Sequence, residues 1–175
     1  MGPESPSDWV VRWAPLVSLG PVLDVAAGGG RHARFFSARN LKVVAVDREP
    51  LDIVGVECVQ ADLENGTPWP FAGQRFGAVV VTNYLHRPLF EPLQASLAEG
   101  GVLIYETFMI GNEKFGRPSN PAFLLRPGEL LEAFTTLTVV AFEQGEVSVP
   151  RPAVIQRLAA VLGPTGPLPE IQSTG

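Results

Sequence analysis

The chain has 175 residues, a length that fits one domain with a single hydrophobic core. Hydrophobic residues make up 46% and charged residues 18%, which excludes a disordered chain, and the single cysteine excludes an internal disulfide framework. A net charge of −5 argues against nucleic acid as a partner. Because neither a signal peptide nor an apolar run of ~20 residues is found, we expect a cytoplasmic protein without membrane contact.

Short apolar runs rich in β-branched residues alternate with helical segments along the chain. Most of these runs lack polar alternation, which is typical of strands buried on both faces in a parallel sheet. We predict seven strands, at Val22–Val25, Lys42–Val46, Val56–Gln60, Ala78–Thr82, Val102–Glu106, Leu137–Phe142 and Ala153–Ala159.

Four helices are predicted between these strands, at Trp9–Val17, Arg31–Arg39, Pro88–Ala98 and Pro127–Phe134. Ser7 or Asp8 caps the first helix, and the third ends at Gly100 and Gly101. The last two strands are joined by a connection too short for a helix, so they form an antiparallel hairpin. The expected fold is α/β, a Rossmann-like three-layer sandwich whose seven-stranded, mostly parallel sheet ends in that hairpin.

The strongest signal for a ligand site is VLDVAAGGGRHARFF, residues 22–36. Three glycines, Gly28 to Gly30, follow a strand and open a helix, where the backbone can bend sharply and present free N–H groups to a ligand. Asp47 ends the second strand, where a carboxylate suits the two hydroxyls of a ribose.

Two interpretations of this segment compete. Residues 28–33 fit the G-x-G-x-x-A fingerprint of a dinucleotide site, which favours a nicotinamide cofactor. However, the carboxylate of Asp24 precedes the glycines, where it would repel phosphates and attract an amino group, unless it only caps the following turn. A ligand with a ribose and an α-amino acid but no phosphate, such as S-adenosylmethionine, suits both Asp24 and Asp47.

On these residues the chain resembles the class I S-adenosylmethionine-dependent methyltransferases, and its Gly-Gly-Gly-Arg segment is similar to their tellurite-resistance and thiopurine methyltransferase branch. The resemblance implies a methyltransferase domain over residues 1–162, with S-adenosylmethionine as cofactor. It implies that the methionine part of the cofactor lies over the glycine segment and the ribose on Asp47. The adenine edge then lies against Asp62 and Leu63, and the amino group of the methionine part lies near Asn83 and Tyr84. The site residues it implies are Asp24, Ala26, Gly28, Gly30, Arg31, Asp47, Arg48, Asp62, Leu63, Asn83 and Tyr84.

The chain departs from the family pattern at two places. Ala26 stands where the family has its first glycine. The link from Asp47 to Val56 is shorter than the usual parallel crossover. We expect either a single helical turn in Arg48–Val54 or a third strand placed elsewhere, which would remove Asp62 from the adenine site.

Residues 108–126 form a long segment rich in glycine, asparagine and proline after the fifth strand. Because ligands bind at that edge of a parallel sheet, and because the segment is rich in large apolar residues, we predict a lid over the acceptor rather than a disordered loop. Its site residues are Phe115, Arg117 and Asn120, and the cations Lys114, Arg117 and Arg126 favour a small or anionic acceptor.

Methyl transfer requires alignment and exclusion of water, and it needs a base only when the acceptor must lose a proton. The candidate bases are His86 and Glu106, each of which also has a structural interpretation. We expect a small-molecule acceptor and no metal. The alternatives are an NAD(P)-binding oxidoreductase-type domain and a non-catalytic S-adenosylmethionine-binding module.

Several other residues carry structural expectations. His32 is expected to be a solvated helix residue, whereas Trp9 and Trp13 are expected to pack in the core or against the lid rather than stack on a substrate. Cys58 is predicted to be a buried filler within a strand. Residues 163–175 are expected to form a flexible tail.

Overall fold

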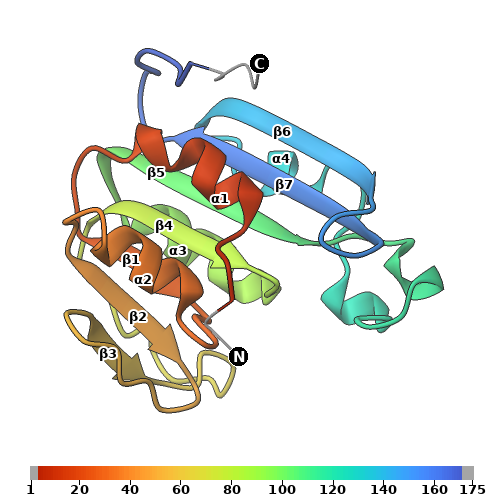
Figure 1. Cartoon of the computed structure of the whole chain (residues 1–175), viewed down its shortest axis with the longest axis horizontal. Coiled ribbons are helices and arrows are strands. Elements are labelled where there is room, and N and C mark those ends of the chain that lie inside the picture. The colour runs from red at the N-terminus through yellow and green to blue at the C-terminus, as the bar shows by residue number, and fades with distance from the viewer. Residues whose placement is uncertain (1–3, 171–175) are drawn as a thin grey trace.

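Seven strands form one sheet, in the order β3-β2-β1-β4-β5-β7-β6, in the computed structural model, which describes residues 4–170 (Figure 1). The strands are β1 Val22–Val25, β2 Val43–Asp47, β3 Glu57–Gln60, β4 Phe76–Thr82, β5 Leu97–Phe108, β6 Thr138–Val147 and β7 Ala153–Val161. Strands β3, β2, β1, β4 and β5 pair in parallel, and β7 is antiparallel to both β5 and β6. The predicted fold class is confirmed.

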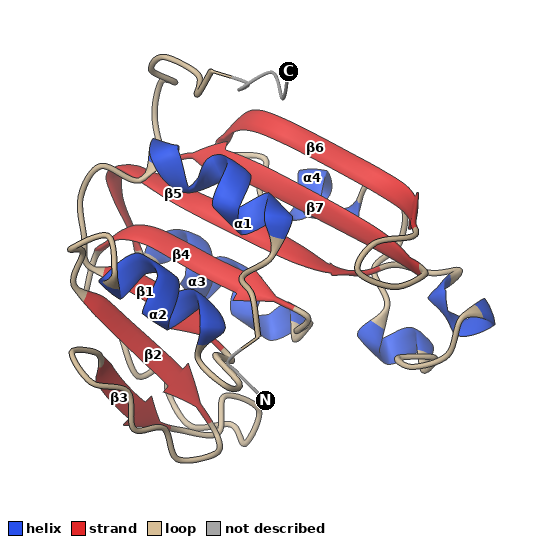
Figure 2. Cartoon of the chain, in the orientation of Figure 1, coloured by secondary structure: helices blue, strands red, loops and turns tan. Residues whose placement is uncertain are grey.

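The helices cover both faces of the sheet and complete three layers (Figures 1 and 2). Helices α1 and α2 lie on one face, and α3 and α4 lie on the other. The α-helices are α1 Asp8–Trp13, α2 Arg31–Ser37, α3 Phe90–Ala95 and α4 Glu129–Ala133. Four 3₁₀ turns are η1 Ala14–Leu16, η2 Arg87–Leu89, η3 Asn112–Lys114 and η4 Pro121–Phe123.

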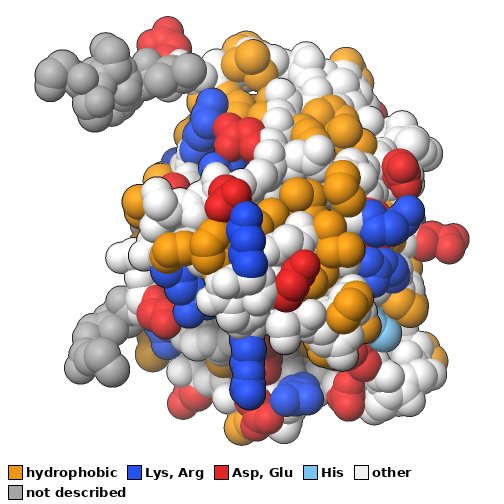
Figure 3. All heavy atoms as spheres, turned by 90° about the vertical axis from the view of Figure 1, so that its right-hand side faces the viewer, with side chains coloured by type: hydrophobic (Ala, Val, Ile, Leu, Met, Phe, Trp, Pro, Cys, Tyr) orange, Lys and Arg blue, Asp and Glu red, His pale blue; other side chains and the backbone are white. Residues whose placement is uncertain are grey.

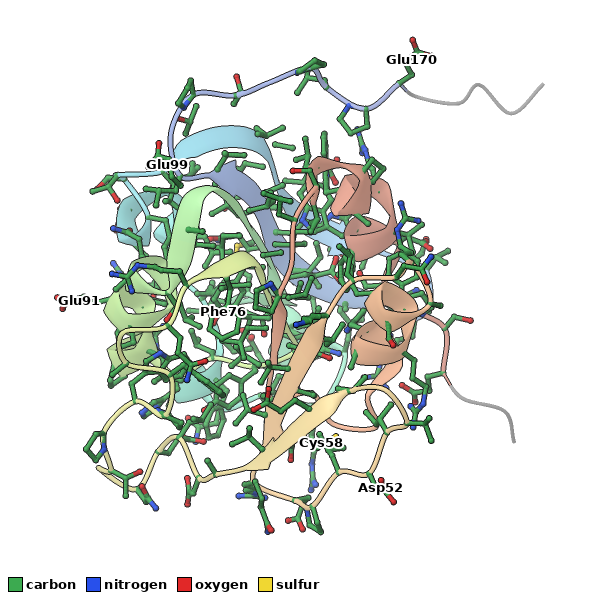
Figure 4. The ribbon with its side chains drawn as sticks, turned by 90° about the vertical axis from the view of Figure 1, so that its left-hand side faces the viewer. Asp52, Cys58, Phe76, Glu91, Glu99 and Glu170 are labelled. Atoms are coloured by element: carbon green, nitrogen blue, oxygen red, sulfur yellow. The ribbon has the colours of Figure 1, made fainter. Side chains whose placement is uncertain are left out.

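The central strands bury side chains on both faces, as their continuous apolar runs predict. Alternate residues point to opposite faces of a strand, so each strand contributes to two separate clusters. One cluster packs under α3 and α4 and includes Leu23, Val79, Leu103 and Phe76, the last of which is labelled in the interior in Figure 4. The other packs under α1 and α2 and includes Val22, Val80, Ile104, Trp9 and Trp13. Both tryptophans lie in the core, which is one of the two placements predicted for them.

The sequence left Ser7 and Asp8 open as the cap of the first helix, and Ser7 is confirmed: its Oγ accepts a hydrogen bond from the Trp9 N–H at 3.2 Å, and Asp8 is the first helical residue. The predicted end of the third helix is wrong. The helix predicted through Ala98 ends at Ala95, because β5 begins at Leu97 and pairs there with Phe76 of β4. The two glycines expected to stop the helix therefore lie inside a strand.

The short link between β2 and β3 contains no helix, so the expected helical turn in Arg48–Val54 is wrong. Strand β3 nevertheless pairs in parallel with β2, at the edge of the sheet, with Val46 opposite Val59. The link is thus long enough to return the chain to the neighbouring position without a covering helix. This placement keeps Asp62 beside the end of β2.

Edge position changes the environment of Cys58. Its side chain is half-buried, because β3 has no neighbouring strand on its outer side and no helix in the preceding link (Figure 4). The prediction of a fully buried cysteine is therefore wrong.

The last described residues, 165–170, contain neither helix nor strand. The expected flexible tail at 163–175 stays a prediction, and residues 171–175 lie outside the described part. Over residues 4–170, no helix combines the length and the apolar character that crossing a membrane requires.

Candidate functional site

A cavity of about 520 Å³ lies at the carboxyl ends of the parallel strands. Its walls come from the residues that follow β1, β2, β3 and β4, from the end of β5, and from the segment after β5. Its lining consists of Ala26, Asp47, Arg48, Glu49, Ala61, Asp62, Leu63, Glu64, Asn83, Tyr84, Leu85, Thr107, Phe108, Pro118 and Phe123. This edge is where open α/β sheets bind ligands, and the volume suits a small molecule or cofactor.

The cavity brings together most of the residues that the sequence singled out for a cofactor. Those in its lining are Ala26, Asp47, Arg48, Asp62, Leu63, Asn83 and Tyr84. Asp24, Gly28, Gly30 and Arg31 are not among the lining residues. Gly28 and Gly30 belong to the loop between β1 and α2, Asp24 lies in β1, and Arg31 begins α2.

Asp47 is held by two backbone N–H groups at the end of β2. Its Oδ2 accepts a hydrogen bond from Gly28 N at 2.8 Å, and its Oδ1 accepts one from Glu49 N at 2.9 Å. A carboxylate oxygen has about two acceptor positions, so each oxygen retains one for a hydroxyl group of a ligand. The glycine loop therefore fixes this carboxylate in an orientation suited to a pair of ribose hydroxyls.

Asp62 lies in the same cavity because β3 is parallel to β2. The backbone N–H of Ala61 donates to the carbonyl of Asp47 at 3.0 Å, which ties the residues after the two strands together. Asp62 Oδ1 accepts from Glu64 N at 2.9 Å, and Oδ2 makes no hydrogen bond within residues 4–170. The carboxylate is thus oriented and retains an acceptor for an amino group.

Asp24 is only 1% exposed and lies beneath the glycine loop. Its Oδ2 accepts a hydrogen bond from Ala33 N, in the first turn of α2, at 3.0 Å. Burial raises the pKa of this carboxyl from 3.8 to about 7. The contact seen is the turn-capping one that the sequence also allowed, so Asp24 joins β1 to α2 and supports the loop.

The glycines above Asp24 adopt backbone conformations that side chains disfavour. Gly28 has φ +57° and Gly30 has φ +83°, both in the left-handed region. A Cβ on Gly30 would also lie 2.3 Å from Cδ1 of Ile53, whereas a Cβ on Gly28 would meet nothing within 4 Å. Ala26, at the family's glycine position, has φ +53° and therefore carries this backbone cost in the cavity wall.

His32 is 2% exposed, so the expectation of a solvated helix residue is wrong. Its Nε2 accepts a hydrogen bond from Ser7 N at 3.0 Å, and Thr82 Oγ1 lies 3.4 Å from its Nδ1. Burial, with the nearby charge of Arg31, lowers its pKa to about 4. The N-terminal segment covers this face of α2, a contact for which the local sequence of α2 contains no signal.

Neither candidate base lines the cavity. Glu106 is engaged on the α1 side of the sheet, where Oε1 accepts from Ser7 Oγ at 2.7 Å and Oε2 accepts from Arg157 at 3.1 Å. His86 is half-buried, with Nδ1 3.5 Å from Glu64 Oε1. The geometry gives Glu106 a structural contact and places His86 beside Glu64, which lines the cavity, without His86 belonging to the lining itself.

The segment predicted as a lid is folded over one side of the cavity, to which it contributes Phe108, Pro118 and Phe123. Arg87 holds it in place: the guanidinium donates to the carbonyls of Ala122 at 3.1 Å and Leu124 at 2.9 Å, and it pairs with Glu129 at 2.7 Å. This arginine was not singled out for the lid because its partners are 35 or more residues away in sequence.

The three residues predicted for lid function have different positions. Asn120 caps η4 by accepting from Ala122 N at 3.0 Å, and it is absent from the cavity lining. Phe115 and Arg117 line a second, smaller recess beside the cavity. No described contact tests whether the segment opens, so its role as a lid stays a prediction.

The charge of the cavity is strongly negative. Asp47, Glu49, Asp62 and Glu64 line it, and Arg48, which lies 3.8 Å from Glu49, supplies the only cationic side chain in the lining of residues 4–170. Burial and then the charge of Glu64 raise the pKa of the Tyr84 phenol, which keeps this hydroxyl neutral. Such walls attract a cationic ligand and oppose the entry of phosphate groups.

The strand order and the terminal hairpin form the fold that several solved methyltransferases share, one of them described as S-adenosylmethionine-dependent. The structure of TehB from Haemophilus influenzae has the same fold and is 14% identical, with a TM-score of 0.72 over 88% of this chain. The chain spans only 61% of the length of that TehB structure.

Two other structures show the same fold over nearly their whole length. A putative methyltransferase from Bacillus halodurans C-125 is 17% identical, with a TM-score of 0.65, over 89% of this chain and 99% of its own. The glycopeptide N-methyltransferase MtfA, solved with S-adenosyl-L-homocysteine, is 19% identical, with a TM-score of 0.59, over 88% of both chains. No family model and no curated protein matches the sequence.

Proposed function

We propose that the chain is an S-adenosylmethionine-dependent methyltransferase that binds its cofactor in the acidic cavity and acts on a small-molecule acceptor. The observation that carries this proposal is the charge of the cavity wall, with four carboxylates and one arginine. S-adenosylmethionine has a sulfonium, an ammonium and one carboxylate, so its net charge is positive. A nicotinamide dinucleotide carries two phosphates, which the same walls would repel.

In this proposal the two oriented acids hold different parts of the cofactor. Asp47, held by Gly28 and Glu49, accepts hydrogen bonds from the ribose hydroxyls. Asp62 accepts a hydrogen bond from the adenine amino group through its free oxygen. The methionine part then lies toward Asn83 and Tyr84, beyond the end of β4. In this proposal Asp24 acts through the loop and not through contact with the cofactor.

The comparisons support the assignment of cofactor and reaction. MtfA is solved with S-adenosyl-L-homocysteine on the same fold, and TehB agrees with the branch that the Gly-Gly-Gly-Arg segment resembles. The cofactor supplies a methyl group already activated on a sulfonium. In this proposal the residues of the chain orient the two reactants and exclude water, and Phe108 and Phe123 of the cavity lining cover the acceptor.

Calorimetric titration with S-adenosylmethionine, S-adenosyl-L-homocysteine and NADH tests the proposal. We expect both adenosyl ligands to bind and NADH not to bind. Asp47→Asn removes a charge and weakens acceptance of the hydroxyls, so it should reduce the affinity for S-adenosylmethionine by about tenfold or more. Asp52→Asn is the matched control, because this exposed residue in the same link is absent from the cavity lining (Figure 4).

Each competing function predicts a different result. Binding of NADH without binding of S-adenosylmethionine would contradict the proposal in favour of an oxidoreductase-type domain. Binding of S-adenosylmethionine with no release of S-adenosyl-L-homocysteine across an acceptor screen would favour the non-catalytic module. Equal loss of affinity in Asp47→Asn and Asp52→Asn would contradict the placement of the ribose.

A further inference from the structure

A second recess of about 200 Å³ adjoins the acidic cavity on the side away from β2 and β3. Phe108 lines both spaces, and Arg117 and Pro118, which are consecutive, face the recess and the cavity respectively. The recess is completed by Phe115 and by Arg151 in the turn between β6 and β7. On this side of the molecule, hydrophobic side chains gather among charged side chains of both signs (Figure 3).

The charge of the recess is opposite to that of the cavity. Arg117 and Arg151 line it together, and no carboxylate belongs to its lining. Across residues 4–170, neither guanidinium has a carboxylate within 4.0 Å or a hydrogen bond to the protein. The other cations of the lid are paired: Lys114 with Glu146 at 2.9 Å, and Arg126 with Glu129 at 3.4 Å. Of the three cations that the sequence offered for an anionic acceptor, only Arg117 remains available.

The two arginines belong to segments whose relative position is fixed. Asn112 is 2% exposed and lies between them in the recess. Its Nδ2 donates to the carbonyl of Pro118 at 3.0 Å, and its Oδ1 accepts from Val154 N at 3.0 Å. One buried amide thus joins the lid, which carries Arg117, to the start of β7, which follows Arg151. Both backbones are held in place before any ligand arrives.

We propose that this recess binds a carboxylate of the methyl acceptor, with Arg117 and Arg151 as its cationic partners. Phe108 and Phe115 contact the flat apolar group that carries the carboxylate, so the acceptor class is an aromatic or similarly planar carboxylic acid. This inference rests on the proposed function, since the cavity beside it must hold the cofactor. Its new content is the chemistry of the acceptor and the residues that select it.

The chemistry of the lining favours this class over other anions. A guanidinium presents parallel N–H groups that match the two oxygens of a carboxylate. Aromatic rings beside it provide apolar contact and a face for cation–π stacking. A recess of about 200 Å³ accommodates one ring with its substituent and not a second nucleotide. With its carboxylate held there, the remainder of the acceptor extends past Phe108 into the cavity.

The test uses benzoate as the probe, with the full chain saturated with S-adenosyl-L-homocysteine. Binding is followed by two-dimensional NMR at the backbone amides of Asn112 and Ala153, which line the recess. We expect saturable shifts with benzoate and at least about tenfold weaker binding of benzamide, which has the same shape without the charge. Inorganic phosphate should bind more weakly than benzoate because it makes no contact with the two rings.

Variants assign the binding to the two arginines. Arg117→Gln and Arg151→Gln should each weaken benzoate binding by about threefold to tenfold, and the double variant should abolish it. Arg75→Gln is the matched control, because this exposed arginine precedes β4 and is absent from both linings. Both substituted positions are exposed, so folding should be unaffected, which thermal unfolding verifies.

The inference would be overturned by equal binding of benzamide, by equal binding of phosphate, or by an equal effect of Arg75→Gln. It would also be overturned if benzoate bound only in the absence of S-adenosyl-L-homocysteine, because the recess would then be part of the cofactor site. Failure of the proposed function is distinguishable, because it appears as absent S-adenosylmethionine binding in calorimetry without benzoate. Absent benzoate shifts in a chain that binds S-adenosylmethionine would overturn this inference alone.

Discussion

Burial of His32 makes the stability of the protein depend on pH in a way that two variants can separate. The pKa of His32 falls from 6.5 to about 4 in the folded chain. Its contribution to stability is therefore complete above pH 6.5. As the pH falls from 6.5 toward 4, the unfolded chain takes up a proton that the folded chain refuses. This contribution is lost at about 1.4 kcal/mol per pH unit, which amounts to about 3 kcal/mol near pH 4.

Asp24 has the opposite dependence. Its pKa rises from 3.8 to about 7, so its contribution is complete below pH 3.8 and is lost as the pH rises toward 7. The slope has the same size, about 1.4 kcal/mol per pH unit, and the opposite sign. Between pH 4 and 6.5 the two slopes largely cancel, so the free energy of unfolding of the natural chain depends little on these two groups. Removal of either group leaves the pH dependence that the other one causes.

Urea unfolding, followed by far-ultraviolet circular dichroism over this pH range, measures both slopes. His32→Gln should be less stable than the natural chain near neutrality by about 1 kcal/mol, because the hydrogen bond from Ser7 N is weakened. It should become the more stable protein by about 1–2 kcal/mol near the acidic end of the range. Asp24→Asn should instead gain stability over the natural chain as the pH rises. Differences from the natural chain that do not vary with pH would refute the reasoning, since they would mean that the two groups titrate alike in the folded and unfolded states.

Three further predictions follow from the contacts of the site. Asp24→Asn should change the affinity for S-adenosylmethionine by no more than about threefold, because Asp24 does not line the cavity. If calorimetry showed a loss as large as that of Asp47→Asn, Asp24 would have to contact the cofactor directly. Arg87→Ala should lower the free energy of unfolding in urea by about 3 kcal/mol, because Glu129, which is 3% exposed, loses its main partner. The same variant should be cleaved faster by proteases within residues 110–123. Unchanged cleavage would show that other contacts hold this segment. Gly28→Ala should lower the stability by about 1 kcal/mol because of its left-handed backbone conformation. Gly30→Ala should lower it more, because the new Cβ would also clash with the side chain of Ile53. Equal losses in thermal unfolding would contradict this packing reason.

Much of the fold could be predicted from local patterns. Uninterrupted apolar runs such as Val22–Val25 indicated strands buried on both faces, and the short connection before β7 indicated the antiparallel hairpin. The helix ends were harder to predict, because Leu97 belongs to a strand only through its pairing with Phe76. Propensity gives no account of a partner that lies 21 residues earlier in the chain.

The sequence by itself determined the sheet, the glycine turn and the acids at the strand ends, because these depend on the periodicity and residue types of single segments. Only the tertiary structure decided which groups meet. It buried His32 under Ser7, engaged Glu106 with Arg157, and left Arg117 beside Arg151. Charge and burial arise from neighbours that are distant in sequence, so a residue's pKa and availability to a ligand are settled only when the chain has folded.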